Sequence, residues 1–252
     1  RERSVGLGVM GFHSFLQKNL IPFESVMAKV WNTKIFKYID QEVNKASKKL
    51  AEERGPCPDA KDYGIMERFS NKTAIAPTAS ISIICGGSSP GIEPIAGNSY
   101  THKTLSGSFN VRNKFLEEVL NKYGKNNNET WSSITTSQGS VQHLDFLTQE
   151  EKDVFKTAFE LDQRWLIDLS ADRTPYISQA QSLNIFLPAD VHKKDLHQIH
   201  FQSWKKGLKS LYYCRSKSIQ RAEVVSKSFV ASTTEKTQNE EPKNYEECLS
   251  CQ

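Results

Sequence analysis

Two neighbouring tyrosines, Tyr212 and Tyr213, lie at the end of the segment LKSLYYC, whose composition predicts a strand. Successive side chains of a strand point to opposite faces, so two adjacent rings with polar tips are unusual in a strand buried on one side. One interpretation is that both rings pack at an interface with their hydroxyls hydrogen-bonded. The other is that the rings stack, with centroids roughly 4.5–7 Å apart. Stacked tyrosines could carry an electron together with a proton, because tyrosine can hold an oxidised state.

A second candidate site is the segment TAIAPTASIS, in which a short apolar run leads into the small residues Pro77, Thr78, Ala79 and Ser80. An apolar stretch that can form a helix follows. The N–H groups at a helix start have no partner within the helix, and together with hydroxyl groups they suit an anion such as phosphate. The alternative is ordinary capping, because Ser and Thr begin many helices that bind no ligand. Glu93, beyond the Pro90-Gly91 turn, is expected to order this loop.

A third candidate is the cysteine pair Cys248 and Cys251, which are two residues apart near the end of the sequence. A structural zinc site would need two more ligands at suitable spacing, and none is found. A thioredoxin-type site would need the pair to open a helix in a βαβ unit, and this segment lacks that context. Two interpretations remain. The pair is either a dithiol on a flexible tether that exchanges disulfides with another site, or two thiols of a polar tail without a function.

The composition argues against several classes of function. The 252 residues carry 33 Lys and Arg against 29 Asp and Glu, a formal charge of +4. Without a long basic run, this charge predicts no nucleic-acid binding. No window is apolar enough for a membrane span, and no signal peptide is recognised. The five cysteines are too few for a disulfide scaffold, which favours a reducing cytoplasm. The six histidines form no metal-binding pattern, so no metal site is expected.

The elements that must position these residues are helices alternating with short apolar strands. Apolar residues three and four positions apart, from Ile35 to Leu50, predict a helix that Gly55 ends. Further helices are expected over residues 112–123, 150–170 and 190–206, the second behind a capping box of Thr148 and Glu151. The polar composition of residues 124–147 predicts a loop, and the short apolar runs in the segments TAIAP, SLNIFLP and LKSLYYC predict strands. Such alternation indicates an α/β fold with a largely parallel sheet, whose active sites collect at the carboxyl ends of the strands.

The composition changes after residue 216. Residues 217–252 are rich in Glu, Lys, Thr and Asn and poor in aliphatic side chains. Such a segment cannot bury enough apolar surface to offset its ordering entropy, which predicts a flexible tail. We therefore divide the chain into a globular part, residues 1–216, and a tail, residues 217–252. The sequence starts at Arg1 with an apolar, glycine-rich segment and no initiator Met, so we expect a piece of a longer protein.

Five segments carry a resemblance to a known family when they are taken in order. They are GLGVMGF, TAIAPTASIS with PGIEP, SQAQSLNIFLP, GLKSLYYCRS and the terminal cysteine pair. Together they resemble the C-terminal part of the large, catalytic subunit of class I ribonucleoside-diphosphate reductase, over essentially all 252 residues. The segment YTHKTLSGSFNVRNKFLE is most similar to the forms of tailed bacteriophages. The resemblance implies a ten-stranded α/β barrel built from two parallel half-barrels. Residues 1–216 would supply most of the second, C-terminal half.

The resemblance also implies roles for particular residues. Tyr212 and Tyr213 match the pair that relays a radical from the small subunit to the active-site cysteine. Cys248 and Cys251 match the tail pair that re-reduces the active-site disulfide after each turnover. The loop that holds the substrate's diphosphate is matched by Pro77, Thr78, Ala79, Ser80 and Ile81. The radical-bearing cysteine, its flanking Asn and Glu, and the active-site disulfide precede the matched region in this family.

The implied reaction is the replacement of the ribose 2′-hydroxyl of a ribonucleoside diphosphate by hydrogen, through thiyl-radical chemistry. No cofactor is expected on this chain. The dimetal and tyrosyl-radical cofactor would belong to the small subunit, and ATP or deoxynucleotide effectors would bind the N-terminal part. The implied partners are that N-terminal part, the small subunit, a second large subunit, and thioredoxin or glutaredoxin. The implied setting is the cytoplasm, or the host cytoplasm for a phage protein.

Two other functions remain open from the sequence. A non-catalytic scaffold could keep the reductase fold, but scaffolding requires neither the tyrosine pair nor the terminal cysteines. A thiol–disulfide carrier could act through the tail alone, but it would leave the diphosphate loop and the tyrosines unexplained.

Overall fold

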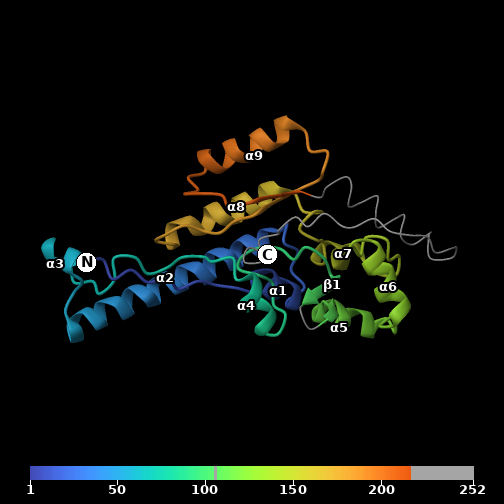
Figure 1. The fold of residues 1–252 in the computed structure, drawn as a ribbon, viewed down its shortest axis with the longest axis horizontal. Coiled ribbons are helices and arrows are strands. Elements are labelled where there is room, and N and C mark those ends of the chain that lie inside the picture. Colours follow the sequence, from blue (N-terminus) through green and yellow to red (C-terminus); the bar gives the residue numbers. More distant parts are fainter. Residues whose placement is uncertain (105–106, 217–252) are drawn as a thin grey trace, which may run out of the picture.

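The computed structural model describes residues 1–104 and 107–216, so the tail of residues 217–252 lies outside the described part of the chain. The molecule is elongated, and its helices are arranged around a central region of extended chain (Figure 1). In chain order the described elements are α1 (Phe12–Lys18), α2 (Val26–Arg54), α3 (Pro58–Asp62), α4 (Ala79–Ile84), β1 (Ser99–Thr104), β2 (Gly107–Arg112), α5 (Lys114–Lys122), α6 (Asn128–Thr136), α7 (Gln149–Val154), α8 (Gln163–Arg173), the 3-10 helix η1 (Thr174–Tyr176), β3 (Ile185–Leu187), α9 (Lys193–Lys205) and β4 (Cys214–Ser216).

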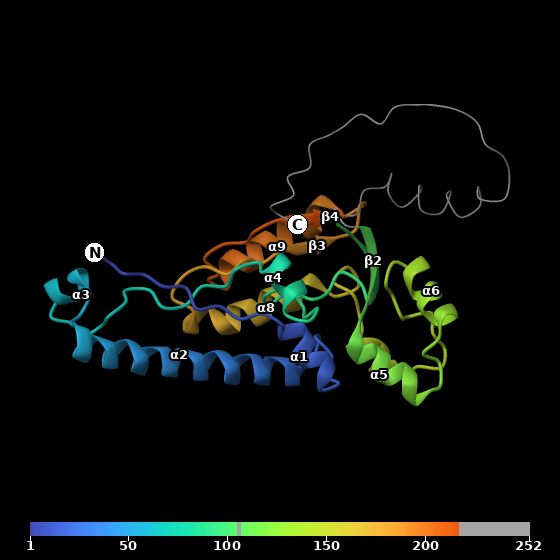
Figure 2. The same ribbon diagram turned by 60° about the horizontal axis from the view of Figure 1, so that its bottom comes forward.

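Three helices form a layered stack along one side of the molecule. Helix α8 packs on the long helix α2, and α9 packs on α8, as Figures 1 and 2 both show. Helices α5, α6 and α7 form a separate group at the end of the molecule away from α3 (Figure 1). In the part of the chain that the structure describes, no helix combines the length and apolar character needed to cross a membrane.

Helix α2 confirms the predicted helix and extends it toward the N-terminus. Ser25 begins the helix, because its hydroxyl accepts a hydrogen bond from Ala28 N at 3.1 Å, and Gly55 with a φ of +78° follows its end. The predicted apolar stripe, from Ile35 to Leu50, is only partly buried. The fully buried face lies slightly to one side of it and consists of Ala28, Asn32, Phe36, Ser47 and Ala51.

Two predictions for residues 124–173 are wrong. The predicted loop contains helix α6. Asn127 caps the start of this helix, because its Oδ1 accepts from Thr130 N at 2.9 Å. The helix buries Trp131 on its inner face. The predicted single helix after the capping box is two helices, α7 and α8. The capping box itself is present. The chain leaves the helix after α7 and restarts at Asp162, which caps α8 by accepting from Arg164 N at 3.0 Å.

Parallel extended segments form the centre of the molecule, in agreement with the predicted α/β class. Leu7 bridges Thr73 and Ile75 bridges Gln181, both in parallel, and β3 pairs with β4 in parallel. The parallel strands are shorter than predicted: the segment TAIAP contributes only the isolated bridges of Thr73 and Ile75, and of LKSLYYC only Cys214 belongs to β4. The longest of the described strands, β1 and β2, form an antiparallel hairpin, which was not among the predicted strands.

Two apolar cores hold these parts in place. The larger core joins α1, α2, α8 and β3, and β3 contributes Ile185, Phe186 and Leu187 to it. The smaller core joins α5, α6 and α7 around Trp131 and Phe155. Each fully buried Leu, Ile or Phe side chain contributes about 1.5–3 kcal/mol. The larger core therefore anchors β3 firmly next to the segment that carries the two tyrosines.

Candidate active site

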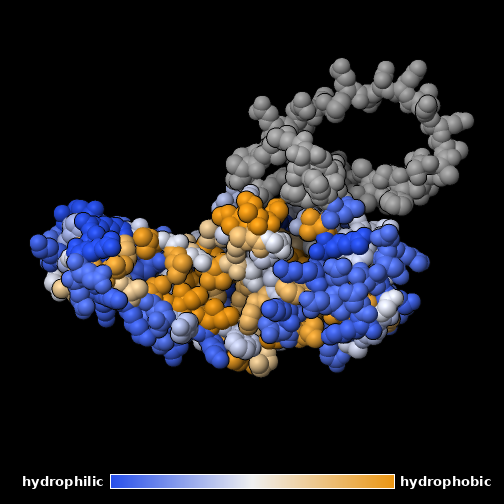
Figure 3. Space-filling model, turned by 90° about the horizontal axis from the view of Figure 1, so that it is seen from below, coloured by the Kyte–Doolittle hydropathy of each residue, from blue (hydrophilic) through white to orange (hydrophobic). Residues whose placement is uncertain are grey.

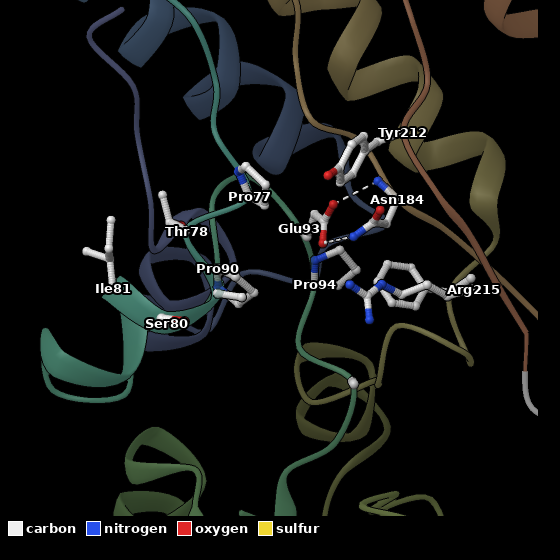
Figure 4. A pocket seen from close by; sticks show the side chains of 13 residues that line it. Pro77, Thr78, Ser80, Ile81, Pro90, Glu93, Pro94, Asn184, Tyr212 and Arg215 are labelled. Atoms are coloured by element: carbon white, nitrogen blue, oxygen red, sulfur yellow. Dashed lines mark hydrogen bonds between the residues drawn. The ribbon is translucent and has the colours of Figure 1, made fainter. Parts of the chain in front are cut away.

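One pocket brings together two of the sites predicted from sequence. It has a volume of about 350 Å³ and is lined by the whole predicted loop, Pro77 to Ile81, and by Tyr212. These residues come from segments more than 130 positions apart, and Figure 4 shows them around one cavity. The remaining lining residues come from the PGIEP turn and the chain just after it, from β3 and the residue before it, and from β4; they are Pro90, Glu93, Pro94, Ala96, Asn184, Phe186 and Arg215.

The loop before α4 has a tight, fixed backbone. Thr78 adopts a left-handed conformation with a φ of 52°, and the first helical hydrogen bond runs from Ser82 N to Thr78 O at 2.9 Å. The N–H groups of residues 79–81 therefore precede the hydrogen-bond ladder of the helix. The Thr78 hydroxyl accepts from Gly91 N at 2.8 Å, which ties the loop to the PGIEP turn. Gly91 has a φ of +47°, and a Cβ there would lie 3.0 Å from Ala76 O, so this position favours glycine.

Glu93 is a buried carboxylate in the wall of this pocket. It is 5% exposed, and it accepts two hydrogen bonds from Asn184, from the backbone N at 2.7 Å and from Nδ2 at 3.0 Å (Figure 4). Burial raises the pKa of Glu93, although the bonds from Asn184 and the charge of Arg215 oppose the rise. From the sequence, Glu93 is expected to order the loop. Its partner could not be identified from neighbouring residues, because Asn184 lies 91 residues further along the chain.

The two tyrosine rings lie together. Their centroids are 4.1 Å apart and their planes are inclined by 50°, so the rings are closer than the predicted range and tilted rather than stacked. Tyr212 is 46% exposed and Tyr213 is 44% exposed, so neither ring is a core residue. Half-exposed rings are compatible both with packing at an interface and with a relay, so both interpretations stay open. Tyr212 lines the pocket, and Tyr213 lies beside it.

An irregularity in the pairing of β3 with the tyrosine segment explains how neighbouring rings meet. Tyr212 N donates to Leu183 O at 2.9 Å, and Ile185 N donates to Tyr213 O at 2.9 Å. Both tyrosines thus lie opposite one residue, Asn184, directly before the paired residues Ile185 and Cys214, so the chain leading into β4 has one residue more than the chain leading into β3. This arrangement is a β-bulge, which breaks the alternation of side chains. The backbone N of Tyr213 is bound by the Asn184 side chain, whose Oδ1 accepts from it at 3.1 Å.

The remaining predicted residues lie apart from this pocket. Cys248 and Cys251 fall outside the described residues, so their predicted role stays a prediction. Of the cysteines that the structure describes, Cys57 is buried, whereas Cys85 and Cys214 are exposed, and all three are free thiols. Within residues 1–104 and 107–216, no three His, Cys, Asp or Glu side chains gather closely enough to hold a metal ion.

Comparison with known proteins identifies the family. A family model described as "Ribonucleotide reductase, barrel domain" matches residues 1–63 and 59–214. The chain belongs to this family. More particularly, it corresponds to the C-terminal part of the large subunit of ribonucleoside-diphosphate reductase, as the following relatives indicate.

The relatives include viral and animal proteins. The chain is 46% identical to the large subunit of Invertebrate iridescent virus 6, over 90% of this chain and 24% of that protein. It is 41% identical to the large subunit of Invertebrate iridescent virus 3, over 100% of this chain and 39% of that protein. It is 33% identical to the large subunit of Danio rerio, over 86% of this chain and 31% of that protein. The chain thus spans between about a quarter and two fifths of these relatives.

A solved structure is also similar. The alpha subunit of the class Id ribonucleotide reductase of Actinobacillus ureae has a TM-score of 0.81 and 41% identity, over 90% of this chain and 41% of that one. This likeness and the family match confirm the α/β class and the assignment to the reductase barrel. The viral relatives named above are iridescent viruses. They do not support the bacteriophage resemblance, which stays a prediction.

Proposed function

We propose that this chain is the part of a ribonucleoside-diphosphate reductase large subunit that binds the substrate's diphosphate and delivers the radical. The observation that carries the proposal is the shared pocket. The loop of residues 77–81 and the ring of Tyr212 line one cavity, and the ring of Tyr213 lies 4.1 Å from that of Tyr212. A scaffold would need neither feature.

In this proposal the diphosphate binds at the start of α4. The backbone N–H groups of residues 79–81 have no carbonyl partner within α4, and phosphate oxygens can accept hydrogen bonds from them. The Thr78 hydroxyl already accepts from Gly91 N, so its own proton is available to a phosphate oxygen. Arg215 adds a positive charge to the wall of the pocket, and its Nε is buried without a hydrogen-bond partner among the described residues. Hydrogen bonds to a charged phosphate are stronger than those between neutral groups.

The tyrosine pair would pass the radical toward the substrate. An oxidised Tyr213 takes one electron and one proton from Tyr212, which restores the Tyr213 phenol and leaves the radical on Tyr212. Tyr212 then takes an electron and a proton from a cysteine of the N-terminal part and leaves a thiyl radical there. The 4.1 Å between the two ring centroids makes the first transfer short.

The rest of the reaction would use residues of the N-terminal part of the large subunit. The thiyl radical would abstract the 3′-hydrogen of the ribose, and the 2′-hydroxyl would leave as water with a proton from a dithiol of the N-terminal part. That dithiol would also supply two electrons and the hydrogen that replaces the hydroxyl, and so become a disulfide. Return of the 3′-hydrogen to the ribose would restore the thiyl radical. Cys248 and Cys251 would then reduce that disulfide by exchange and be reduced in turn by thioredoxin or glutaredoxin. The metal and radical cofactor would reside in the small subunit, and the effectors would bind the N-terminal part. We place this assembly in the cytoplasm.

The surface supports assembly with a complement. Figure 3 shows apolar surface gathered in the middle of one face, between two hydrophilic ends. Large apolar side chains are exposed in the described part of the chain, among them Leu7 at 53%, Val30 at 50% and Ile84 at 84%. Apolar surface of this kind is typical of a protein that associates with a partner. We propose that the partners are the N-terminal part, the small subunit and a second large subunit.

The test is reconstitution. This chain, the N-terminal part of a related large subunit and its small subunit are mixed with a ribonucleoside diphosphate and a reductant. The proposal predicts formation of the deoxyribonucleoside diphosphate in the complete mixture and none when this chain is left out. A complete mixture that assembles and binds the nucleotide but forms no deoxynucleotide would favour a scaffold.

A further inference from the structure

We propose that Glu93 and Asn184 are positioning residues, which hold the Tyr212–Tyr213 bulge at a fixed place relative to the loop of residues 77–81. The proposal rests on the proposed function, because it assigns these two residues a task within the radical relay. Four hydrogen bonds carry it, and they connect the loop before α4 to the backbone of Tyr213.

The connection begins at the predicted diphosphate loop. The Thr78 hydroxyl accepts from Gly91 N at 2.8 Å, and Glu93 N donates to Pro90 O at 3.1 Å. The turn that carries Glu93 is therefore fixed to the loop and folded on itself. Glycine at position 91 allows this close approach, because a Cβ would lie 3.0 Å from Ala76 O.

The connection continues through two buried side chains. Glu93 is 5% exposed and Asn184 is 2% exposed, so water does not compete for their hydrogen bonds. One oxygen of the Glu93 carboxylate accepts from Asn184 N at 2.7 Å, and the other accepts from Asn184 Nδ2 at 3.0 Å. A carboxylate only accepts hydrogen bonds, so it requires the NH2 end of the Asn184 amide to face it.

The orientation of this amide decides what faces the tyrosines. With its NH2 group toward Glu93, Asn184 presents Oδ1 to Tyr213 N, which donates to it at 3.1 Å. If the amide were turned over, its oxygen would face the carboxylate and its NH2 group would face another N–H. Glu93 thus selects the orientation of Asn184 that binds the bulge.

The bulge needs this support because it adds a residue to the strand. The ladder bonds of Tyr212 N and Tyr213 O fix the bulge on either side, and Asn184 Oδ1 binds the backbone N between them. A slip of the pairing by one residue would turn every side chain to the opposite face. Since electron transfer slows steeply with distance, a change in the place of either ring would lower turnover without touching the diphosphate.

The test exchanges the two polar groups. In Glu93→Gln, an NH2 group faces that of Asn184. In Asn184→Asp, two carboxylates face each other. The double variant Glu93→Gln/Asn184→Asp restores a donor opposite an acceptor at every bond, leaves an acceptor for Tyr213 N, and keeps the net charge. The three variants and the unaltered chain are compared in the reconstituted reductase, with kcat, KM and the Kd for nucleoside diphosphate measured for each.

We expect each single variant to lower kcat at least about tenfold while Kd changes less than about twofold. The double variant should return kcat to within about threefold of the unaltered enzyme. Glu160→Gln is the matched control, because Glu160 also accepts from a backbone N–H, that of Thr157 at 2.7 Å, in a part of the chain that does not line the pocket. It should leave kcat unchanged. If Asn184→Asp does not fold, the proposal is tested by comparing kcat of Glu93→Gln with kcat of the double variant.

The outcomes separate this inference from the function on which it rests. An unaltered assembly that binds nucleotide but never reduces it contradicts both. In an active assembly, single variants with unaltered kcat contradict the positioning role alone. A double variant no better than Glu93→Gln also contradicts it, because the carboxylate would then act through its charge at position 93. Equal losses of kcat and nucleotide affinity would show a general defect of the pocket and overturn the proposal as well.

Discussion

The rings of Tyr212 and Tyr213 lie with their centroids 4.1 Å apart, although the two residues are neighbours in the chain. The alternation of a regular strand would direct them to opposite faces. The β-bulge opposite Asn184 removes this obstacle, and it places Tyr212 in the wall of the pocket that contains residues 77–81. The geometry of the backbone, rather than the composition of the strand, therefore makes a relay between these rings possible.

A negative charge at Ser80 should weaken nucleotide binding. Ser80 lies in the first turn of α4 and lines the pocket. An aspartate there is compatible with the helix, because acidic side chains stabilise helix N-termini. It would repel the diphosphate, and we expect Ser80→Asp to raise the Kd at least about tenfold, which corresponds to about 1.4 kcal/mol.

The control for this prediction is Ser80→Asn, which has nearly the same size as the aspartate without its charge. It should change the Kd less than about threefold. Equilibrium binding of a ribonucleoside diphosphate to the reconstituted large subunit measures both variants. Equal affinities for the Asp and Asn variants would contradict diphosphate binding at this loop.

His13 should make the fold sensitive to acid. The ring is fully buried and its Nδ1 accepts from Ile95 N at 3.0 Å. Burial lowers the pKa of His13 to about 3, although a contact with the Val154 carbonyl opposes this. The unfolded chain has an ordinary histidine pKa near 6.5 and so binds the proton first. Between about pH 6.5 and pH 3, the free energy of unfolding should fall with falling pH by up to about 1.4 kcal/mol per unit from this residue.

Denaturant unfolding at pH 7, 6 and 5 measures this dependence. The matched variant is His13→Gln, which stays neutral and can still accept from Ile95 N. Its free energy of unfolding should fall less steeply between pH 7 and pH 5 than that of the unaltered chain. Identical slopes for the two proteins would show that His13 does not titrate on unfolding.

Much of this arrangement could be predicted from the sequence where the signals are local. The periodicity from Ile35 to Leu50 gave helix α2, and Thr148 with Glu151 gave the capping box. The loop of residues 77–81 and the tyrosines were found as candidates from residue types and resemblance. Helix α6 was missed because its polar composition resembles a loop, although Asn127 is a good N-cap residue.

The features that could not be predicted depend on contacts between distant residues. Nothing near Glu93 indicates that its carboxylate binds Asn184, and nothing near Tyr213 indicates a bulge. Both follow only when residue 184 is placed beside residues 93 and 213. The break between α7 and α8 has a similar cause, since Glu24, far away in the chain, accepts from Asp162 N at 2.6 Å just before α8 begins.

The predicted tail pair should be needed for repeated turnover only. Cys251→Ser removes one thiol of the exchange, so we expect the reconstituted enzyme to complete a single turnover and then stop when thioredoxin is the reductant. Product formed per enzyme, with limiting and with excess reductant, measures this. Cys85→Ser is the control, because Cys85 is an exposed free thiol without a predicted role, and it should sustain turnover. Steady turnover by Cys251→Ser would exclude the exchange.

The radical relay through the tyrosine pair is tested most directly by turnover of Tyr213→Phe in the reconstituted reductase. This change keeps the ring and removes the hydroxyl, so the pathway loses the group that exchanges the proton and electron. We predict at least about a 100-fold loss of kcat, which corresponds to about 2.7 kcal/mol, with the Kd for ribonucleoside diphosphate unchanged. Tyr63→Phe, at a tyrosine that is 82% exposed and lies outside the pocket, should keep full activity. A Tyr213→Phe enzyme that reduces its substrate at the unaltered rate would contradict the relay.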